Sequence, residues 1–334
     1  MDGHHDGRSR PVVSARALVN SVDKPAVCLM GPTASGKTEI AISLCQRFPF
    51  DIVSVDSALV YRGMDIGTAK PDAKTLRDTP HRLIDIRDPE ESYSAGDFVR
   101  DARIEMNAIH SAGRVPLLVG GTMMYFRALM RGIAELPSAD EQIRAAIDAD
   151  AAELGWPAMH GRLCEVDPTA AERIDPNDSQ RIQRALEVYL ASGRPLSDWH
   201  RSMPAQQWPV DVRFIRLALQ PASRAILHER IERRLDRMLH GGFLDEVRTL
   251  MRRPQLNRDT PSMRAVGYRQ IWEHLAGECT FAEGRYRALV ATRQLAKRQI
   301  TWLRSEQELF SFDPLESLTI DAISENLANL LNRA

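Results

Sequence analysis

The sequence predicts an α/β fold with a P-loop-type parallel sheet flanked by helices, interrupted by an all-helical insertion domain. Short apolar runs alternate with helical stretches from residue 26 to residue 130, and such alternation with short links is typical of a parallel, doubly wound sheet. A glycine-rich phosphate-binding motif joins the first strand to the first helix. Residues 137–206 then break the pattern, because they hold helical stretches separated by prolines and no convincing strand.

The first predicted elements are a strand at Ala26–Met30 and a helix at Lys37–Phe48, whose apolar residues recur at helical spacing. A second buried strand is expected at Ile52–Val55, directly before Asp56. The apolar run Leu83–Ile86 predicts a third strand. The order strand, loop, helix, strand sets the start of the sheet.

Ser94 is expected to cap a helix that runs to about His110. Val115–Val119 is the clearest strand, closed by Gly120-Gly121-Thr122 and followed by a helix at Met123–Met130. Val212–Leu219 restores a strand signal after the insertion, and long helices follow. We therefore expect a disordered tail at 1–24, a P-loop α/β core at 25–136 and 207–312, a helical insertion at 137–206 and a C-terminal helical segment at 313–334.

Composition excludes several classes of protein. The 334 residues include 44 Lys+Arg and 45 Asp+Glu, which is ordinary for a globular protein and excludes disorder throughout. The four cysteines form no Cys-x-x-Cys pair and no Cys/His cluster, so we expect reduced thiols and no zinc site. No apolar run approaches the roughly 20 residues that span a bilayer. We expect a cytoplasmic monomer with no membrane partner and no signal peptide.

Charge is unevenly distributed along the chain. Residues 135–178 hold 11 acids and 3 arginines, whereas residues 213–304 hold 19 bases and 9 acids. A basic block is compatible with a polyanionic partner, and equally with a solvated helical surface. Charge alone leaves both interpretations open.

The segment from Gly31 to Thr38 satisfies the Walker A pattern and lies between a predicted strand and a helix start. In such a loop the backbone N–H groups and the helix N-terminus cradle phosphate oxygens, Lys37 neutralises them, and the Thr38 hydroxyl ligates Mg²⁺. The loop holds ATP, GTP or another diphosphate equally well. The structural alternative is a glycine-rich turn with an ordinary helix cap.

Two polar residues follow predicted strands, where ligands of parallel sheets bind. Asp56 has three open roles: a Mg²⁺ ligand, a general base, or a turn residue capping Ser57. Thr122 follows two glycines that allow a ligand to approach the backbone. Without further context, the favoured reading of Thr122 is a plain helix N-cap.

Several long motifs occur in one order along the chain: GPTASGKT at 31–38, VSVDSALVYRGMDIGTAKP at 53–71, HRLIDI at 81–86, PLLVGGTMMYF at 116–126, NDSQRIQRALEVY at 177–189, RAVGYRQ at 264–270 and ATRQLAKRQITWLR at 291–304. Together they resemble the tRNA dimethylallyltransferases, also called tRNA isopentenyltransferases, over about residues 25 to 304.

The resemblance implies transfer of a dimethylallyl group from dimethylallyl diphosphate to tRNA, with Mg²⁺ as cofactor. The acceptor is the exocyclic amino nitrogen of the adenosine 3′-adjacent to the anticodon in tRNAs reading codons that start with U. The products are N6-(dimethylallyl)adenosine and diphosphate. Without the resemblance, the residues alone also allow a P-loop small-molecule kinase that uses ATP.

The resemblance also implies roles for individual residues. Asp56 is the general base, Thr122 orients the base or the diphosphate, and Lys37 stabilises the leaving group. Arg234 helps to bind the diphosphate, although Arg230 and Arg233 lie close by in the same basic helix. The expected diphosphate-binding residues are Gly31, Thr33, Ala34, Ser35, Gly36, Lys37, Thr38 and Arg234, with Thr38 as the metal ligand.

The tRNA anticodon stem-loop is the implied partner. The expected contacts in the core are Asp56, Ser57, Ala58, Leu59, Thr122, Arg264, Ala265, Val266, Gly267, Tyr268, Arg269, Lys297, Arg298, Gln299, Ile300, Thr301, Trp302, Leu303 and Arg304. Those in the insertion are Arg144, Gln180, Arg181, Ile182, Gln183 and Arg184.

Helical geometry tests two of these segments. At about 100° per residue, Arg293, Lys297 and Arg304 share one face of a helix, opposite Leu295, Ala296, Trp302 and Leu303. In the helix from Ser179 to Ala191, Ile182, Leu186 and Tyr189 form an inner stripe, with Gln180, Arg181 and Arg184 outward and a cap at Asn177 or Asp178. A plain surface helix remains the alternative for both.

Overall fold

The computed structural model describes residues 24–134, 136–137, 140–202 and 212–332. Contacts divide the chain into two compact units, Met1–Met130 with Trp208–Ala334, and Arg131–Gln207. The expected tail at 1–24 lies outside the described residues apart from Lys24. Among the described residues, no helix has both the length and the apolar character needed to cross a bilayer.

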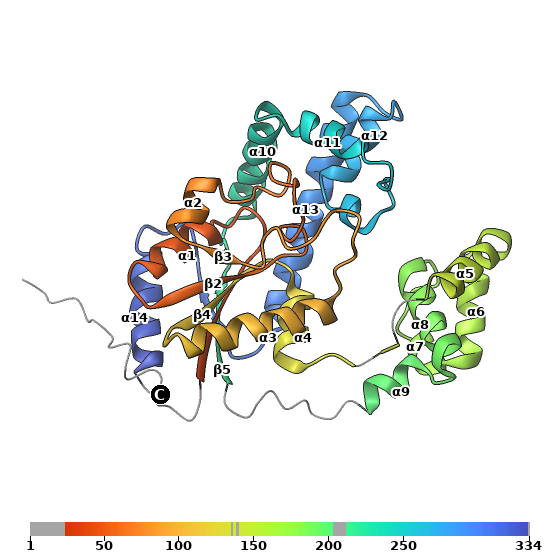
Figure 1. Cartoon of the computed structure of the whole chain (residues 1–334), viewed down its shortest axis with the longest axis horizontal. Coiled ribbons are helices and arrows are strands. Elements are labelled where there is room, and N and C mark those ends of the chain that lie inside the picture. Colours follow the sequence, from red (N-terminus) through yellow and green to blue (C-terminus); the bar gives the residue numbers. More distant parts are fainter. Residues whose placement is uncertain (1–23, 135, 138–139, 203–211, 333–334) are drawn as a thin grey trace, which may run out of the picture. The chain divides into compact units, whose positions relative to one another are not determined.

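The first unit is built on a six-stranded sheet with strand order β3-β2-β4-β1-β5-β6, and every pairing is parallel. The strands are β1 (Lys24–Met30), β2 (Phe50–Val55), β3 (His81–Arg82), β4 (Val115–Gly120), β5 (Val212–Leu219) and β6 (Phe310–Phe312). The central strand β1 is buried along its length except at Lys24, as a strand covered on both faces requires. Figure 1 shows helices on either side of this sheet.

One face of the sheet is covered by α1 (Lys37–Cys45) and α14 (Thr319–Leu331). Their buried residues join alternate strand residues such as Val27 and Leu29 in one apolar cluster. Cys28 and Met30 lie between these and point to the other face. The helix α3 (Ala95–Ser111) packs against β2 and β4.

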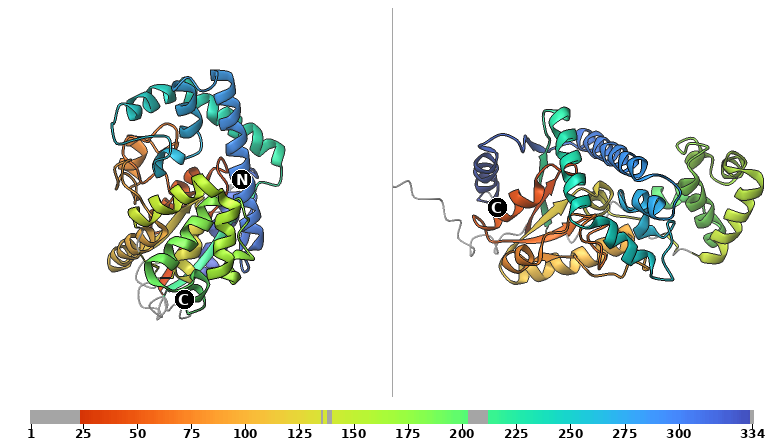
Figure 2. Two further views of the ribbon diagram at one scale, coloured as in Figure 1. Left: turned by 90° about the vertical axis from the view of Figure 1, so that its right-hand side faces the viewer. Right: turned by 90° about the horizontal axis from the view of Figure 1, so that it is seen from above.

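A group of helices follows β5 and carries much of the basic block. It comprises α10 (Arg224–His240), α11 (Phe243–Met251), the 3-10 turn η1 (Pro261–Arg264), α12 (Tyr268–Leu275) and α13 (Phe281–Ser305). Leu227, Ile231 and Leu235 of α10 pack against Ala288, Leu289 and Ala296 of α13. The two helices lie side by side in both Figure 1 and the right-hand view of Figure 2.

The described residues of the second unit form helices joined by turns and loops, with no strand among them. The unit contains α5 (Glu141–Leu154), α6 (Trp156–Val166), α7 (Pro168–Ala171), α8 (Ser179–Ser192) and α9 (Leu196–Arg201). These helices share a separate core, in which Leu163 and Ile182 are fully buried. The sequence places the helical insertion at 137–206, within the slightly wider unit defined by contacts.

Several predicted elements are confirmed. Ser94 caps α3 in a reciprocal capping box with Asp97, β5 spans the predicted residues, and α4 (Met123–Arg131) follows β4. The helix predicted to reach Phe48 ends at Cys45.

The strand predicted at Leu83–Ile86 is wrong. Leu83 and Asp85 have φ angles of 63° and 56°, a left-handed conformation that no strand adopts. The ladder with β2 forms instead at His81 and Arg82. The edge strand β6 was not predicted, because it spans three residues and is largely exposed.

Candidate active site

The loop Gly31–Thr38 connects β1 to α1 and presents backbone N–H groups at the start of the helix. Gly36 precedes α1 with φ 89°, and no side-chain oxygen caps the first turn. Ala34 also has a positive φ, 63°. The amides at the helix N-terminus are therefore available to an anion, which the helix dipole also favours.

Lys37 folds back over this loop. Its Nζ donates hydrogen bonds to the carbonyl oxygens of Gly31 and Pro32 at 2.9 and 2.7 Å. Burial and the nearby positive charge of Arg234 lower the pKa of Lys37 to about 8, although Asp56 opposes the shift. The lysine therefore holds its proton less tightly than usual in the free protein.

Two arginines of α10 reach the loop region from the side. Arg230 Nε donates to the carbonyl oxygen of Ala34 at 2.9 Å, and Arg234 Nη2 donates to that of Thr68 at 3.0 Å. Arg233 points away, since it pairs with Glu229 and its side chain is 63% exposed. Burial lowers the pKa of Arg234. Arg230 lies four residues from Arg234 on the same face of α10, and this spacing is the signal that identifies it.

The ends of three neighbouring strands bring the predicted residues together. Gly120 of β4 is in register with Met30 of β1 and with Val55 of β2. The phosphate loop, Thr122 and Asp56 therefore leave the sheet at the same level of its carboxyl edge. This is where parallel sheets bind ligands.

Asp56 begins a tight turn after β2. Its Oδ1 accepts hydrogen bonds from the backbone N–H groups of Ala58 at 2.8 Å and Leu59 at 3.3 Å. The predicted turn-forming role is thus observed for one carboxylate oxygen, at Ala58 and Leu59 rather than at Ser57. The charge of Asp56 also acts on Lys37 and Arg234, which places it within the electrostatic reach of the phosphate loop.

Thr122 bridges the ends of β4 and β2. Its Oγ1 accepts the backbone N–H of Ser57 at 3.1 Å and lies 3.4 Å from Ser57 Oγ. Its backbone carbonyl accepts the N–H of Tyr125 at the start of α4. The hydroxyl is therefore engaged across the strand ends with the turn that Asp56 forms.

The polypeptide after Asp56 is braced from two sides. Glu246 of α11 accepts hydrogen bonds from the backbone N–H groups of Asp65, Ile66 and Gly67 at 2.7–3.0 Å. Sequence reasoning missed Glu246, because a single acid in a charged helix carries no distinguishing pattern.

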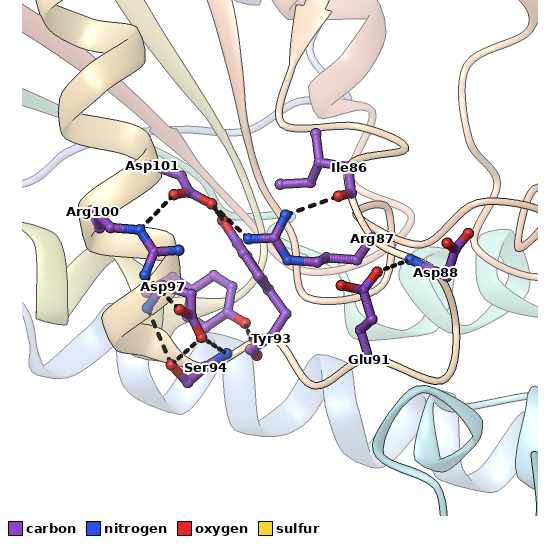
Figure 3. A network of polar contacts seen from close by, with 10 residues as sticks. Ile86, Arg87, Asp88, Glu91, Tyr93, Ser94, Asp97, Arg100 and Asp101 are labelled. Carbon is purple, nitrogen blue, oxygen red and sulfur yellow. Dashed lines mark hydrogen bonds and ion pairs between the residues drawn. The ribbon is translucent and has the colours of Figure 1, made fainter. Parts of the chain in front are cut away.

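The second brace is the network on α3 shown in Figure 3. Arg87 and the Tyr93 hydroxyl both contact Asp101 Oδ2, at 3.3 and 3.2 Å. The guanidinium of Arg87 lies 5.1 Å from the centre of the Tyr93 ring. The backbone of Arg87 in turn bonds to Val60 and Arg62 at 2.9 Å, so α3 supports the segment that continues from the Asp56 turn.

The residues of the first unit that were expected to contact tRNA include both buried and exposed side chains. The side chains of Tyr268, Gln299 and Leu303 are buried and face the protein interior rather than a polynucleotide. Arg293, predicted to face outward with Lys297, instead pairs with Glu232 at 3.0 Å, because α10 packs on that side. The exposed members of the set are Ser57, Arg264, Arg269, Lys297, Arg298, Thr301 and Arg304.

In the second unit, α8 has the predicted sidedness except at Arg184, which pairs with the buried Glu187 rather than facing outward, and at Tyr189, which is only partly buried. Ile182 and Leu186 are buried, and Gln180 and Arg181 are exposed. Asp178 caps the helix by accepting the N–H of Arg181 at 3.2 Å. Ile182 is therefore a core residue of this unit.

A buried carboxylate fixes two arginines of the second unit. Glu187, whose side chain is 1% exposed, pairs with Arg144 at 2.8 Å and with Arg184 at 2.7 Å. It also accepts the backbone N–H of Asp140. Burial would raise the pKa of Glu187, but the hydrogen bonds from Arg184 and Arg144 outweigh it and lower that pKa.

Metal ligands are few at this site. Among the residues that the structure describes, no group of three His, Cys, Asp or Glu side chains could hold a metal ion. The Thr38 hydroxyl, in the first turn of α1, is the predicted ligand. Mg²⁺ characteristically keeps waters and binds substrate phosphates with one or two protein ligands, so this sparse donor set fits a metal that arrives with a diphosphate.

Comparison with protein families identifies one model that matches most of the chain. Residues 59–306 match the family described as IPP transferase. A tRNA dimethylallyltransferase of Thioalkalivibrio sulfidiphilus is 61% identical over 281 residues, which cover 84% of this chain and 87% of the relative. One of Thiobacillus denitrificans is 58% identical over 281 residues, covering 84% and 89%.

Solved structures with the same fold include two bacterial relatives. The tRNA isopentenylpyrophosphate transferase of Bacillus halodurans is 36% identical with a TM-score of 0.68, covering 92% of this chain and 97% of its own. The Staphylococcus epidermidis counterpart is 30% identical with a TM-score of 0.66, covering 92% and 99%. A eukaryotic dimethylallyltransferase acting on tRNA is similar in fold, with a TM-score of 0.73 at 23% identity over 91% and 77%.

Proposed function

Because this chain belongs to the IPP transferase family, we infer that it is a tRNA dimethylallyltransferase, which transfers a dimethylallyl group from dimethylallyl diphosphate to tRNA. The acceptor is the exocyclic amino nitrogen of the adenosine 3′-adjacent to the anticodon, in tRNAs that read codons starting with U. The observation in this chain that supports the inference most directly is the register of β1, β4 and β2, whose carboxyl ends lie side by side. It brings a phosphate loop, a hydroxyl and a carboxylate to one edge of the sheet.

The phosphate loop would hold the leaving group. As the amine nitrogen bonds to the allylic carbon, the allylic C–O bond breaks and its electron pair leaves on the diphosphate. The amides at the N-terminus of α1, with Lys37, Arg230 and Arg234, lie where they can stabilise that growing negative charge. Lys37 has three N–H donors, so it can bind the diphosphate while it keeps its bonds to the carbonyl oxygens of Gly31 and Pro32.

Asp56 is our candidate for the general base. An aromatic amine is a weak nucleophile, so transfer of its proton to a carboxylate assists the attack. The bonds from Ala58 and Leu59 hold Oδ1, and the proton would pass to Oδ2. Thr122 holds Ser57 beside it and would keep the Asp56 turn in place.

Mg²⁺ is the proposed cofactor, with Thr38 as its protein ligand. When bound, it supplies positive charge that neutralises the diphosphate. The other ligands would be diphosphate oxygens and water, which agrees with the sparse donor set at the site.

We place tRNA on the exposed basic residues of each unit. In the first unit these lie on α13 and near η1, with Lys297, Arg298 and Arg304 exposed. In the second unit the proposed contacts are the exposed Arg181, together with Arg144 and Arg184, whose positions are fixed by ion pairs with Glu187. Arginine and lysine contacts of this kind bind phosphates and position the RNA. The target adenosine must leave its stack to meet the diphosphate, as in other base-modifying enzymes.

The transferase assignment is tested by incubating the protein with unmodified tRNA that reads UNN codons. Dimethylallyl diphosphate or ATP is offered, each with and without Mg²⁺, and the nucleosides are analysed by mass. We expect a prenyl-sized mass gain on one adenosine, with dimethylallyl diphosphate and Mg²⁺ both required. ATP consumption with a small hydroxylated metabolite, and no tRNA product, would instead identify a kinase.

The control for this assay is Lys37→Ala. It should abolish product formation, and circular dichroism should show that the variant still folds, because this lysine meets its anionic partner only in the complex. We also propose that the protein acts as a monomer in the cytoplasm, which light scattering at increasing concentration and imaging of a fluorescent fusion would check.

A further inference from the structure

A buried glutamine connects the two halves of the active site. Gln299 of α13 is 8% exposed. Its Oε1 accepts the backbone N–H of Thr33 in the phosphate loop at 2.9 Å, and its Nε2 donates to the backbone carbonyl of Gly121 at 2.8 Å. The first bond reaches the loop after β1 and the second reaches the turn after β4.

The chemistry of the amide matches both partners. A glutamine side chain carries one acceptor end and one donor end, and here each end meets the complementary backbone group. The approach is close, since a Cβ added at Gly121 would lie 2.5 Å from Nε2 of Gln299. Glycine at this position therefore leaves room for the amide that packs against it.

These bonds extend toward the reacting groups. Gly121 directly precedes Thr122, whose Oγ1 accepts the N–H of Ser57, and Asp56 precedes Ser57. A continuous path therefore runs from the phosphate loop through Gln299 to the turn that carries the candidate base. Every backbone group on it is tied by a hydrogen bond of 2.8–3.1 Å.

We propose that Gln299 is a positioning residue that sets the spacing between the phosphate loop and the Asp56–Thr122 turn. This inference rests on the proposed function, since that spacing separates the leaving group from the base. It replaces the expectation that Gln299 contacts tRNA. The exposed Lys297 and Arg298 beside it on α13 remain the candidates for that role.

Three substitutions of Gln299 test the proposal by different changes at one site. Gln299→Glu keeps the shape but turns an acceptor oxygen toward the Gly121 carbonyl, Gln299→Asn shortens the reach, and Gln299→Ala removes both bonds. The matched control is Gln294→Ala, which changes an exposed glutamine of the same helix. Measured quantities are the melting temperature, kcat, KM for each substrate, and the affinity for inorganic diphosphate with Mg²⁺ by calorimetry.

The expected result is a fall in kcat of about 10- to 100-fold in the Gln299 variants, the scale for a misplaced catalytic group. Diphosphate affinity should also fall, KM for tRNA should stay within about twofold of the wild-type value, and the control should match wild type. Variants that melt at a lower temperature but keep wild-type kcat and diphosphate affinity would overturn the proposal. Gln299→Glu is isosteric, so it provides the decisive data if Gln299→Ala fails to fold.

A double substitution tests the link to Thr122. If Gln299 acts through this turn, the kcat loss in Gln299→Ala with Thr122→Ala should be smaller than the product of the two single losses. A kcat loss in the double variant equal to the product of the two single losses would refute the proposal that Gln299 acts through Thr122. An inactive wild-type protein would refute the transferase assignment, and the diphosphate titration would then still decide whether Gln299 orders the phosphate loop.

Discussion

The Tyr268 hydroxyl donates a hydrogen bond to Glu246 Oε1 at 2.5 Å, and the same carboxylate caps the backbone of the loop that follows the Asp56 turn. Tyr268 stays protonated to do this, since burial and the charge of Glu246 raise its pKa. Its ring also packs edge-on against Phe243, and both rings lie so close to Gly67 that a Cβ there would clash. One buried tyrosine of α12 thus sets the carboxylate that holds the loop.

Glu246→Ala should release this loop. Three backbone N–H groups and the Tyr268 hydroxyl lose their acceptor, so the free energy of unfolding should fall by at least about 2 kcal/mol. Urea denaturation measures the change, and kcat should fall with it. Asp245→Ala is the control, because that neighbouring acid is 78% exposed and pairs only with Arg248 among the ion pairs described. Equal stability of both variants would contradict the capping role.

Diphosphate binding should weaken as the pH rises through about 8, the pKa of Lys37 in the free protein. A bound diphosphate favours the charged lysine, so binding above this pH takes up a proton. Calorimetry in two buffers of different ionisation enthalpy measures that uptake. Lys37→Arg stays charged and should lose the dependence near pH 8, whereas an unchanged pH profile would assign it to another group.

The lowered pKa of Lys37 also makes the free energy of unfolding depend on pH. Between about pH 8 and 10.5 the unfolded chain holds the Lys37 proton more tightly than the folded protein does. Stability contributed by this group should therefore increase as the pH rises through that window. Burial is the main cause of the lowered pKa, so the cost of burying the charged lysine reduces stability most below pH 8.

Arg230→Ala should weaken the affinity for inorganic diphosphate about tenfold, equivalent to about 1.4 kcal/mol. Its guanidinium contacts the phosphate loop at Ala34, where it adds positive charge near the proposed ligand. Arg233→Ala is the matched control from the same helix, since Arg233 is exposed and paired with Glu229. Equal losses in the two variants would mean that the general charge of α10, rather than the position of Arg230, drives binding.

Arg181→Ala and Arg184→Ala should have different effects. Arg181 is 70% exposed, so its loss should raise KM for tRNA and reduce the salt slope by about 0.7–0.9 per lost phosphate contact without lowering stability. Arg184 pairs with the buried Glu187, so its loss should also lower the free energy of unfolding. Arg162→Ala, a surface arginine of the same unit paired with Asp150, is the control for both, and its KM for tRNA should match wild type.

Local sequence determined the elements and the chemistry of the phosphate loop. The Gly31–Thr38 spacing specifies a strand-to-helix loop by itself, because its requirements are met by neighbouring residues. Ser94 and Asp97 likewise identify the start of α3, since a capping box acts within one turn. Val212–Leu219 was predicted to the residue, because its apolar pattern and burial agree.

Tertiary structure alone decided how these pieces meet. Nothing in the pattern around Gln299 reveals that it bonds to Thr33 and Gly121, which lie 266 and 178 residues away. The choice of Arg230 over Arg233 and the capping role of Glu246 also depend on which face of a helix meets the sheet edge. The false strand at Leu83–Ile86 has the same origin: an apolar run predicts burial, but only long-range packing decides whether its backbone forms a strand or a turn.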